Sequence, residues 1–175
     1  MKRKSTRYLA EGAVIGAFYA VLTIALAPIS FGVVQFRVSE ALTILPLFTP
    51  AAIPGLTLGC VISNIASIGQ GLPLDMIFGS LATLGSAICM YALRNVKLGK
   101  YPLLAMLMPA VWNGVIIGWE IEHFFIEGDF EFVGFLTQGG LVALGELGVM
   151  AVLGTALYFI IIKNNLNKTV IKKPE

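Results

Sequence analysis

Long runs of apolar residues alternate with short polar segments along most of the chain. A helix needs about 20 apolar residues to cross a bilayer. On this basis the sequence predicts membrane-spanning helices over residues 8–29, 74–94, 101–121 and 136–163.

The stretch from residue 38 to residue 68 is also apolar, but it is interrupted near its middle by Pro50, Pro54 and Gly55. Proline lacks a backbone donor and disfavours helix in the residue before it. We therefore expect two short helices, over residues 38–49 and 53–68, instead of one tilted helix. At about 1.5 Å per residue, neither crosses a bilayer of about 30 Å alone, so neighbouring helices must shield both or the membrane must thin.

The positions of the charged residues favour the same division. Basic residues gather at the N-terminus, between residues 94 and 100, and from residue 163 onward, whereas acids gather between residues 120 and 131. Cytoplasmic segments of membrane proteins are enriched in Lys and Arg. Six spans place every basic cluster in the cytoplasm, whereas five spans place the two later clusters outside. We therefore predict an all-α membrane protein with six transmembrane helices and with both termini in the cytoplasm.

The composition agrees with this pattern. Apolar residues make up 57% of the chain, charged residues 13%, and the mean hydropathy is +0.86. A soluble domain is about 25% charged. Disordered chains, basic nucleic-acid binders and disulfide scaffolds are therefore excluded. We expect one integral membrane domain over residues 1–175, embedded in a lipid bilayer, with no nucleic acid among its partners.

Metal or cofactor chemistry has little support in the sequence. Cys60 and Cys89 lie inside apolar runs without a second ligand at metal-binding spacing, and His123 is the only histidine. One histidine cannot build a metal site alone. We therefore predict no metal and no cofactor.

Polar side chains inside predicted spans are costly, which marks them as functional candidates. Almost all of them fall in the outer half of the six-span arrangement. Asn113 and Glu120 are seven residues apart and so share one helix face, and Glu146 lies roughly 12–15 Å below the outer surface. Together they predict a pocket open to the outside, lined by Arg37, Glu40, Asn64, Asp75, Trp112, Asn113, Glu120 and Glu146.

Some of these side chains have a structural alternative. Arg37 and Glu40 have the spacing of a helical ion pair, and Asp75 can complement a helix dipole near a helix start. Trp119 can be an interface anchor. We expect Glu122, with the acids that follow it up to residue 131, to form a solvated outer loop.

The predicted pocket suits a small, flat, polar ligand with several N–H donors. Carboxylates accept from paired N–H groups, and an aromatic face can stack on a heterocycle or attract a cation. The sequence has no G-x-x-x-x-G-K-[ST] motif, no H-E-x-x-H motif and no serine with a histidine to activate it. We therefore expect a protein that is not an enzyme, whose uptake is driven by an ion gradient or by partner subunits.

Small residues repeat along the first predicted helix. Gly12, Gly16 and Ala20 recur every four residues, and Ala13 and Ala17 form a second row beside them. Such rows let another backbone approach closely. Packing within the chain and docking of a separate membrane subunit both remain open. Only docking predicts a stable, ligand-competent variant that fails to assemble.

Two segments of the chain resemble one known family. They are QFRVSEALT at residues 35–43, which continues through LPLFTPAAIPG at 45–55, and DMIFGSLATL at 75–84, with Gly145-Glu146 later in the chain. Over residues 8–163 the sequence is similar to the QueT family. This resemblance implies the substrate-binding (S) component of an energy-coupling factor transporter, in a prokaryotic cell membrane. It also implies capture from outside of a queuosine precursor, a deazaguanine such as preQ1.

The resemblance implies partners as well. Such S components dock on one transmembrane coupling protein and two ATPase subunits, so ATP hydrolysis belongs to the partners. In related S components an AxxxA motif on the first helix meets the coupling protein. The segment AVIGA at residues 13–17 fits this motif, which makes Ala13, Gly16 and Ala17 candidates for docking.

The ligand that the resemblance implies suggests roles for the pocket residues. PreQ1 has a guanine-like edge with adjacent N–H donors and a cationic aminomethyl arm. We expect Glu120 or Glu146 to accept from that edge and another acid to meet the amine. Asn64 and Asn113 would bond the remaining heteroatoms, and Trp112 would stack on the ring.

Arg37 and Glu40 are expected to shape an outer gate, with lid loops at residues 30–36 and 69–73. Three rival interpretations stay open at this point. They are an S component for another vitamin-like heterocycle, an ion-coupled secondary transporter, and a membrane scaffold that transports nothing.

Overall fold

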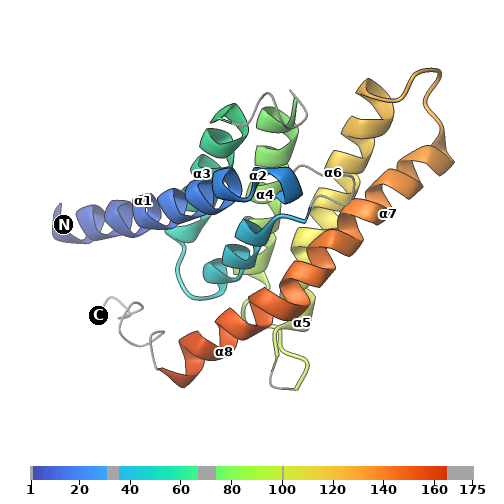
Figure 1. Ribbon diagram of the computed structural model, residues 1–175. Coiled ribbons are helices and arrows are strands. Elements are labelled where there is room, and N and C mark those ends of the chain that lie inside the picture. Colours follow the sequence, from blue (N-terminus) through green and yellow to red (C-terminus); the bar gives the residue numbers. More distant parts are fainter. Residues whose placement is uncertain (1, 31–35, 67–73, 100, 165–175) are drawn as a thin grey trace.

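The computed structural model describes residues 2–30, 36–66, 74–99 and 101–164, with side chains from residue 6 onward. Almost all of this chain is helical. The described ranges contain no β-strand, only an isolated bridge between Leu98 and Tyr101. The prediction of an all-α protein is therefore confirmed (Figure 1).

The helices have these bounds: α1 Lys2–Ala25, α2 Ala27–Ser30, η1 Val38–Leu47, α3 Ala52–Ala66, α4 Asp75–Ala92, α5 Leu103–Met106, α6 Met108–Phe124, α7 Phe132–Val149, η2 Met150–Gly154 and α8 Thr155–Lys163. η1 is a 3-10 helix and η2 is a short π-helix.

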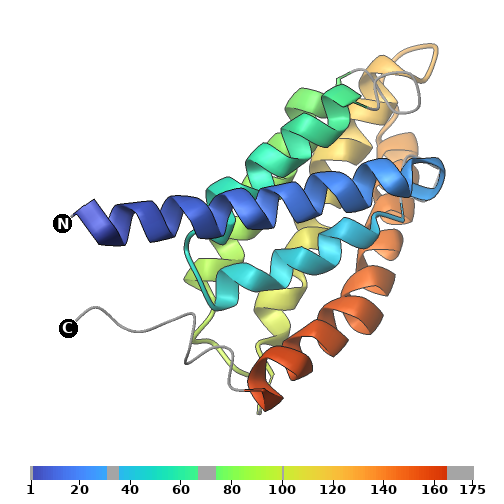
Figure 2. The ribbon, with the colours of Figure 1, turned by 60° about the vertical axis from the view of Figure 1, so that its left-hand side comes forward.

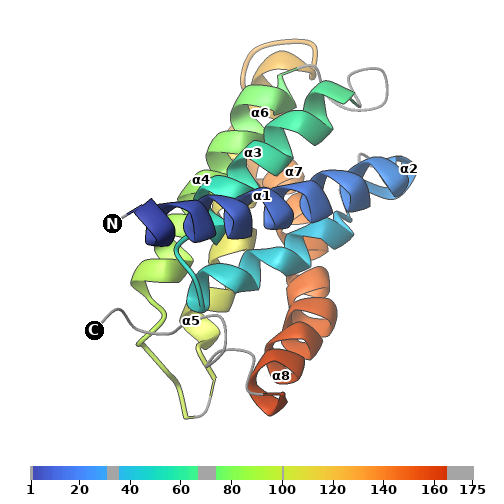
Figure 3. The same cartoon turned by 90° about the vertical axis from the view of Figure 1, so that its left-hand side faces the viewer.

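The helices pack side by side around η1. α6 and α7 form a long antiparallel pair, α4 packs between α6 and α3, and α1 lies across α3 and η1 (Figures 1 and 2). η1 contacts helices from both halves of the chain, including α1, α4, α7 and α8. The view in Figure 3 shows α1 crossing in front of α3 with η1 below it. Side chains that point inward from η1 therefore reach the centre of the bundle.

The chain breaks between η1 and α3, as the proline pair indicates. Phe48 and Thr49 both donate to the Leu45 carbonyl, at 2.8 and 3.0 Å, and α3 starts at Ala52. η1 winds as a 3-10 helix, in which ten residues rise about 20 Å. Pro46 removes one backbone donor, and the Thr43 hydroxyl donates to the Glu40 carbonyl at 2.6 Å. Both features weaken a regular α-helical ladder.

Four helical segments are long and apolar enough to cross a membrane: Thr6–Ala25, Asp75–Ala92, Leu103–Phe124 and Phe132–Lys163. The apolar helices Val38–Leu47 and Ala52–Ala66 are shorter. Each of the six predicted spans thus coincides with helix over most of its described residues, while six crossings and cytoplasmic termini stay predictions.

Three of the predicted spans differ from the observed helices in detail. Helix over 8–29 is interrupted at Leu26, between α1 and α2. The span predicted at 101–121 divides at Leu107 into α5 and α6, because Pro109 in the first turn of α6 has no N–H to donate backward. The last span begins at Phe132 and contains the π-helix η2, where the Thr155 hydroxyl donates to the Met150 carbonyl at 3.1 Å.

Glycines on α1 and α3 let the backbones of these two helices come into direct contact. A Cβ added to Gly16 would lie 2.6 Å from the Gly55 carbonyl oxygen, and one added to Gly55 would lie 2.5 Å from that of Gly12. A Cβ on Gly59 would lie 2.6 Å from the Gly16 oxygen. Any side chain here would push the two helices apart, so the glycine row on α1 packs within the chain.

Candidate functional site

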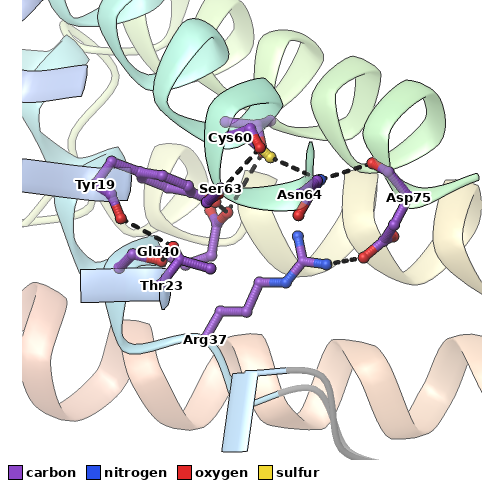
Figure 4. A network of polar contacts seen from close by, with 10 residues as sticks. Tyr19, Thr23, Arg37, Glu40, Cys60, Ser63, Asn64 and Asp75 are labelled. Atoms are coloured by element: carbon purple, nitrogen blue, oxygen red, sulfur yellow. Dashed lines mark hydrogen bonds and ion pairs between the residues drawn. The ribbon is translucent and has the colours of Figure 1, made fainter. Parts of the chain in front are cut away.

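A cluster of buried polar side chains lies where η1 meets α1, α3, α4, α6 and α7. Each helix contributes at least one member, and all are nearly inaccessible to solvent. We call this set the polar cluster; its members are Tyr19, Arg37, Glu40, Cys60, Asn64, Asp75, Thr83, Glu120 and Glu146. Figure 4 shows the part of it that η1, α1, α3 and α4 supply.

Arg37 and Asp75 form an ion pair at one end of the polar cluster. The guanidinium donates through Nη2 to Oδ2 of Asp75, and both side chains are 1% exposed. Asn64 on α3 donates from Nδ2 to the Asp75 backbone carbonyl at 2.7 Å. Asp75 therefore has a charged partner at its side chain and a hydrogen-bond donor at its backbone carbonyl. These contacts add to the helix-dipole role that its position near a helix start predicts.

Gly79, one turn after Asp75, leaves room beside this pair. A Cβ there would lie 3.2 Å from Asn64 Nδ2, 3.2 Å from Asp75 Oδ1 and 3.4 Å from an Arg37 guanidinium nitrogen. Glycine thus lets the backbone of α4 come close to three polar groups from three different elements.

Glu40 lies further along η1 and is held by hydroxyl groups. The Tyr19 phenol on α1 donates to its Oε1, and the Thr83 hydroxyl on α4 lies 3.4 Å from the same oxygen. Thr83 also lies 3.4 Å from Cys60 Sγ on α3. The direct bonds of Arg37 and Glu40 thus reach other helices, to Asp75 and from Tyr19 respectively, while Arg37 still acts on Glu40 electrostatically.

Glu120 and Glu146 complete the polar cluster from the opposite side. The Glu120 carboxyl on α6 interacts with that of Asp75, and the Glu146 carboxyl on α7 interacts with that of Glu40. The Arg37 guanidinium acts electrostatically on both Glu120 and Glu146. The bundle therefore gathers four carboxyl groups around one guanidinium.

Many acceptor atoms of the polar cluster are buried without a hydrogen-bond donor. Among the residues that the structure describes, these acceptors are Glu40 Oε2, Asn64 Oδ1, Asp75 Oδ1, both Glu120 carboxyl oxygens and Glu146 Oε2. Unpaired buried polar atoms are costly, and native structures contain few of them. Their concentration in one place leaves the polar cluster able to accept hydrogen bonds from a group rich in N–H donors. No group of three or more His, Cys, Asp or Glu in the described ranges could hold a metal ion.

Six of the eight residues predicted to line a pocket therefore belong to the polar cluster, and two do not. Trp112 on α6 packs on Gly85 of α4, where an added Cβ would lie 2.6 Å from its ring, and its indole donates to Cys89 Sγ at 3.3 Å. Gly85 is ten residues beyond Asp75 on α4, about 15 Å along that helix. Asn113 is buried and donates to the Pro109 carbonyl of its own helix at 3.0 Å. The predicted stacking and hydrogen-bonding roles of these two residues stay predictions.

The prediction of a solvated outer loop is wrong for Glu122. Glu122 is 5% exposed, and its carboxylate accepts from the Glu131 backbone N–H at 3.2 Å. It packs on Gly134, where a Cβ would lie 2.3 Å from it. Glu122 is on α6, and the contact is with the N-terminal end of α7. Glu127 and Asp129 are exposed as expected. The lid loops lie largely in residues 31–35 and 67–73, outside the described residues.

The candidate docking residues on α1 separate into two groups. Gly16 is buried against Gly55, whereas Ala13 and Ala17 are exposed on the neighbouring face. These alanines border a cavity of about 490 Å³ between α1 and α3, whose wall includes Leu58 and Ile62. The alanine row is therefore exposed, while the glycine row borders the same cavity from its buried side. Docking through Ala13, Gly16 and Ala17 stays a prediction.

Sequence reasoning missed Tyr19, Cys60, Gly79 and Thr83. A periodic signal exists for the two on α4, because Asp75, Gly79 and Thr83 are spaced by four residues and so share a helix face. Cys60 precedes Asn64 by the same interval on α3. Tyr19 offers a weaker signal: a tyrosine inside an apolar span needs a partner for its hydroxyl when it is buried.

The amino-acid sequence of the chain is similar to that of known proteins. The sequence matches the family described as QueT transporter over residues 9–163. The chain belongs to the QueT transporter family. A curated relative, the Queuosine precursor transporter QueT of Lactococcus lactis subsp. cremoris (strain MG1363), is 33% identical over 159 residues, which cover 83% of this chain and 87% of that protein. No solved structure matches the chain. QueT family membership and the long apolar helices identify a membrane transport protein.

Proposed function

We propose that this protein is the substrate-specific S component of an energy-coupling factor transporter and that it captures a queuosine precursor, preQ1 or a related deazaguanine. The carrying observation is the concentration of buried, unpaired acceptor atoms around Arg37. The name of the Lactococcus relative supports the class of substrate.

The chemistry of the polar cluster fits such a ligand. A guanine-like edge presents adjacent N–H donors, and a carboxylate accepts two parallel N–H bonds well. Asp75 Oδ1 and both oxygens of Glu120 offer such acceptors beside Asn64, whose amide oxygen is also unpaired. An aminomethyl arm adds a positive charge, which suits a site with four carboxyl groups and one guanidinium.

Energy for transport would come from partner subunits. The exposed Ala13 and Ala17 would dock on a transmembrane coupling protein, since small residues on a membrane helix allow close packing. Two ATPase subunits would bind and hydrolyse ATP. The proposed topology has six crossings with both termini in the cytoplasm, and a reporter fused after Lys173 that appeared outside the cell would overturn it.

Isothermal titration of the purified protein tests the substrate. The ligands are preQ1, queuine, guanine and a panel of vitamins, and tight binding is expected for preQ1 or another deazaguanine. Tight binding of a vitamin alone would replace the substrate while keeping the S-component role. Binding of no ligand in the panel would contradict the proposal.

Reconstitution separates the transport mechanisms. In liposomes this chain alone, under a proton or sodium gradient, is expected to give no uptake of preQ1. Uptake is expected once the coupling protein and the ATPases are present with ATP. Uptake by the chain alone under an ion gradient would instead establish a secondary transporter.

A further inference from the structure

The carboxyl groups of the polar cluster fall into two pairs on facing helices. Asp75 of α4 lies near Glu120 of α6, where the rings of Phe78 and Trp119 from the same two helices have centroids 5.6 Å apart. Glu40 of η1 lies near Glu146 of α7, about one helical turn before the contact of the Thr43 hydroxyl with Met150 Sδ at 3.5 Å. Glu40 follows Arg37, the partner of Asp75, by three residues, which is a rise of about 6 Å in a 3-10 helix. The two pairs are therefore close neighbours at different levels of the bundle.

The two pairs have different hydrogen-bond donors. Asp75 receives the Arg37 guanidinium directly. Glu40 instead receives two neutral hydroxyls, from Tyr19 and Thr83, and both reach its Oε1. Oε2 of Glu40 and Oε2 of Glu146 are buried without a donor, on side chains that are 0% and 2% exposed. Arg37 therefore offsets the negative charge of the Glu40–Glu146 pair only from a distance. The two Oε2 atoms remain available as hydrogen-bond acceptors.

We propose that Glu40 and Glu146 form an ammonium subsite that binds the cationic arm of the substrate, while Arg37, Asp75, Asn64 and Glu120 recognise the edge of its ring. This inference rests on the proposed function. A primary ammonium is compact and has three N–H donors, so it can contact both Oε2 atoms at once. It also removes the repulsion between two neighbouring carboxylates. The short rise between Arg37 and Glu40 suits a fused bicyclic ring that carries a one-carbon arm.

Tyr19 and Thr83 are positioning residues in this arrangement. By donating to Oε1 from two different helices, α1 and α4, they fix the orientation of the Glu40 carboxylate and leave Oε2 for the ligand. Thr83 lies eight residues beyond Asp75, about 12 Å along α4, so it holds Glu40 on the deeper side of the ring.

Two ligands with the same ring separate the subsites. The first is 7-aminomethyl-7-deazaguanine, which is cationic, and the second is 7-cyano-7-deazaguanine, which is neutral. Titration of wild type, Glu40→Gln, Glu146→Gln and Glu120→Gln with both ligands gives the ratio of the two Kd values for each protein. In Glu40→Gln and Glu146→Gln we expect affinity for the amine to fall by about tenfold to a hundredfold, with little change for the nitrile. Glu120→Gln is the matched control, and it should weaken both ligands alike.

A Tyr19→Phe variant tests the ammonium subsite independently, in case a glutamine variant does not fold. It retains the ring and removes only the hydroxyl, and we expect a loss of about three- to tenfold in affinity for the amine alone. Equal losses for both ligands, or no loss for either, in a folded Glu40, Glu146 or Tyr19 variant would overturn the ammonium subsite while the proposed function stands. Failure of wild type to bind either ligand would overturn both the ammonium subsite and the proposed deazaguanine substrate.

Discussion

Arg37 and Asp75 form a buried ion pair across a sequence separation of 38 residues. The pair joins the start of η1 to the start of α4, and Asn64 of α3 bonds to the same aspartate. Three helices that are consecutive along the chain are therefore tied together at one point beside the proposed substrate.

Breaking this pair should destabilise the protein strongly. Asp75→Asn removes the carboxylate to which the buried Arg37 guanidinium donates, and breaking such a buried pair costs about 3–5 kcal/mol. Glu11→Gln is the control, because it removes the charge from the more exposed Arg7–Glu11 pair, which is worth about 1 kcal/mol or less. Thermal unfolding in detergent measures both variants. Equal stability losses would contradict a structural role for the Arg37–Asp75 pair.

The two rows of small residues on α1 should behave differently. Gly16→Leu places a side chain where even a Cβ would lie 2.6 Å from the Gly55 oxygen, so we expect a loss of about 1–3 kcal/mol or more. Ala17→Leu, on the exposed face, should keep both stability and substrate affinity but lose co-purification with the coupling protein. If Ala17→Leu assembles normally, docking does not use the alanine row.

Gly79 should matter for the site more than for the fold. In Gly79→Ala the new methyl group would lie 3.2 Å from both Asn64 Nδ2 and Asp75 Oδ1, so these groups must shift by a few tenths of an ångström. We expect affinity for the substrate to fall about fivefold, since a displaced acceptor weakens its hydrogen bond. Gly140→Ala on α7 meets no atom within 4 Å and should leave binding unchanged. An unchanged titration curve for Gly79→Ala would show that the substrate does not use these groups.

A variant at Trp112 separates a role in packing between helices from a role in stacking on the ligand. Trp112→Phe removes part of the contact with Gly85 and the hydrogen bond to Cys89 Sγ. We expect a stability loss of about 1–3 kcal/mol with unchanged affinity, because the residue lies outside the polar cluster. Unfolding and calorimetry on the same preparation separate the two effects. Weaker binding by a variant of normal stability would restore the stacking role.

Local features of the sequence were sufficient for most of the fold. Pro50 and Pro54 indicate the break before α3 because the missing donor acts on the nearest residues. The burial of Glu40 and Glu146 follows from their positions inside apolar segments. The contact of Thr43 with Met150, 107 residues later, joins η1 to η2, and local pattern does not reveal it.

Partners of the site residues were harder to predict than the residues themselves. The direct pairing of Arg37 with Asp75 depends on how η1 and α4 pack, and local spacing indicates only Glu40 as a possible partner. Trp112 and Trp119 both face α4, since Trp119 contacts Phe78 and Trp112 contacts Gly85. The seven residues between the two tryptophans place Trp112 about 10 Å further along α6, away from the polar cluster.

Four buried carboxyl groups around one guanidinium also determine what the site rejects. A cell contains many guanine nucleotides that present the same ring edge as a deazaguanine but carry phosphate groups. A phosphate group brings further acceptor oxygens to a site whose unpaired buried atoms are themselves acceptors, so acceptor would face acceptor. The proposed site would thereby favour a free base over a phosphorylated purine.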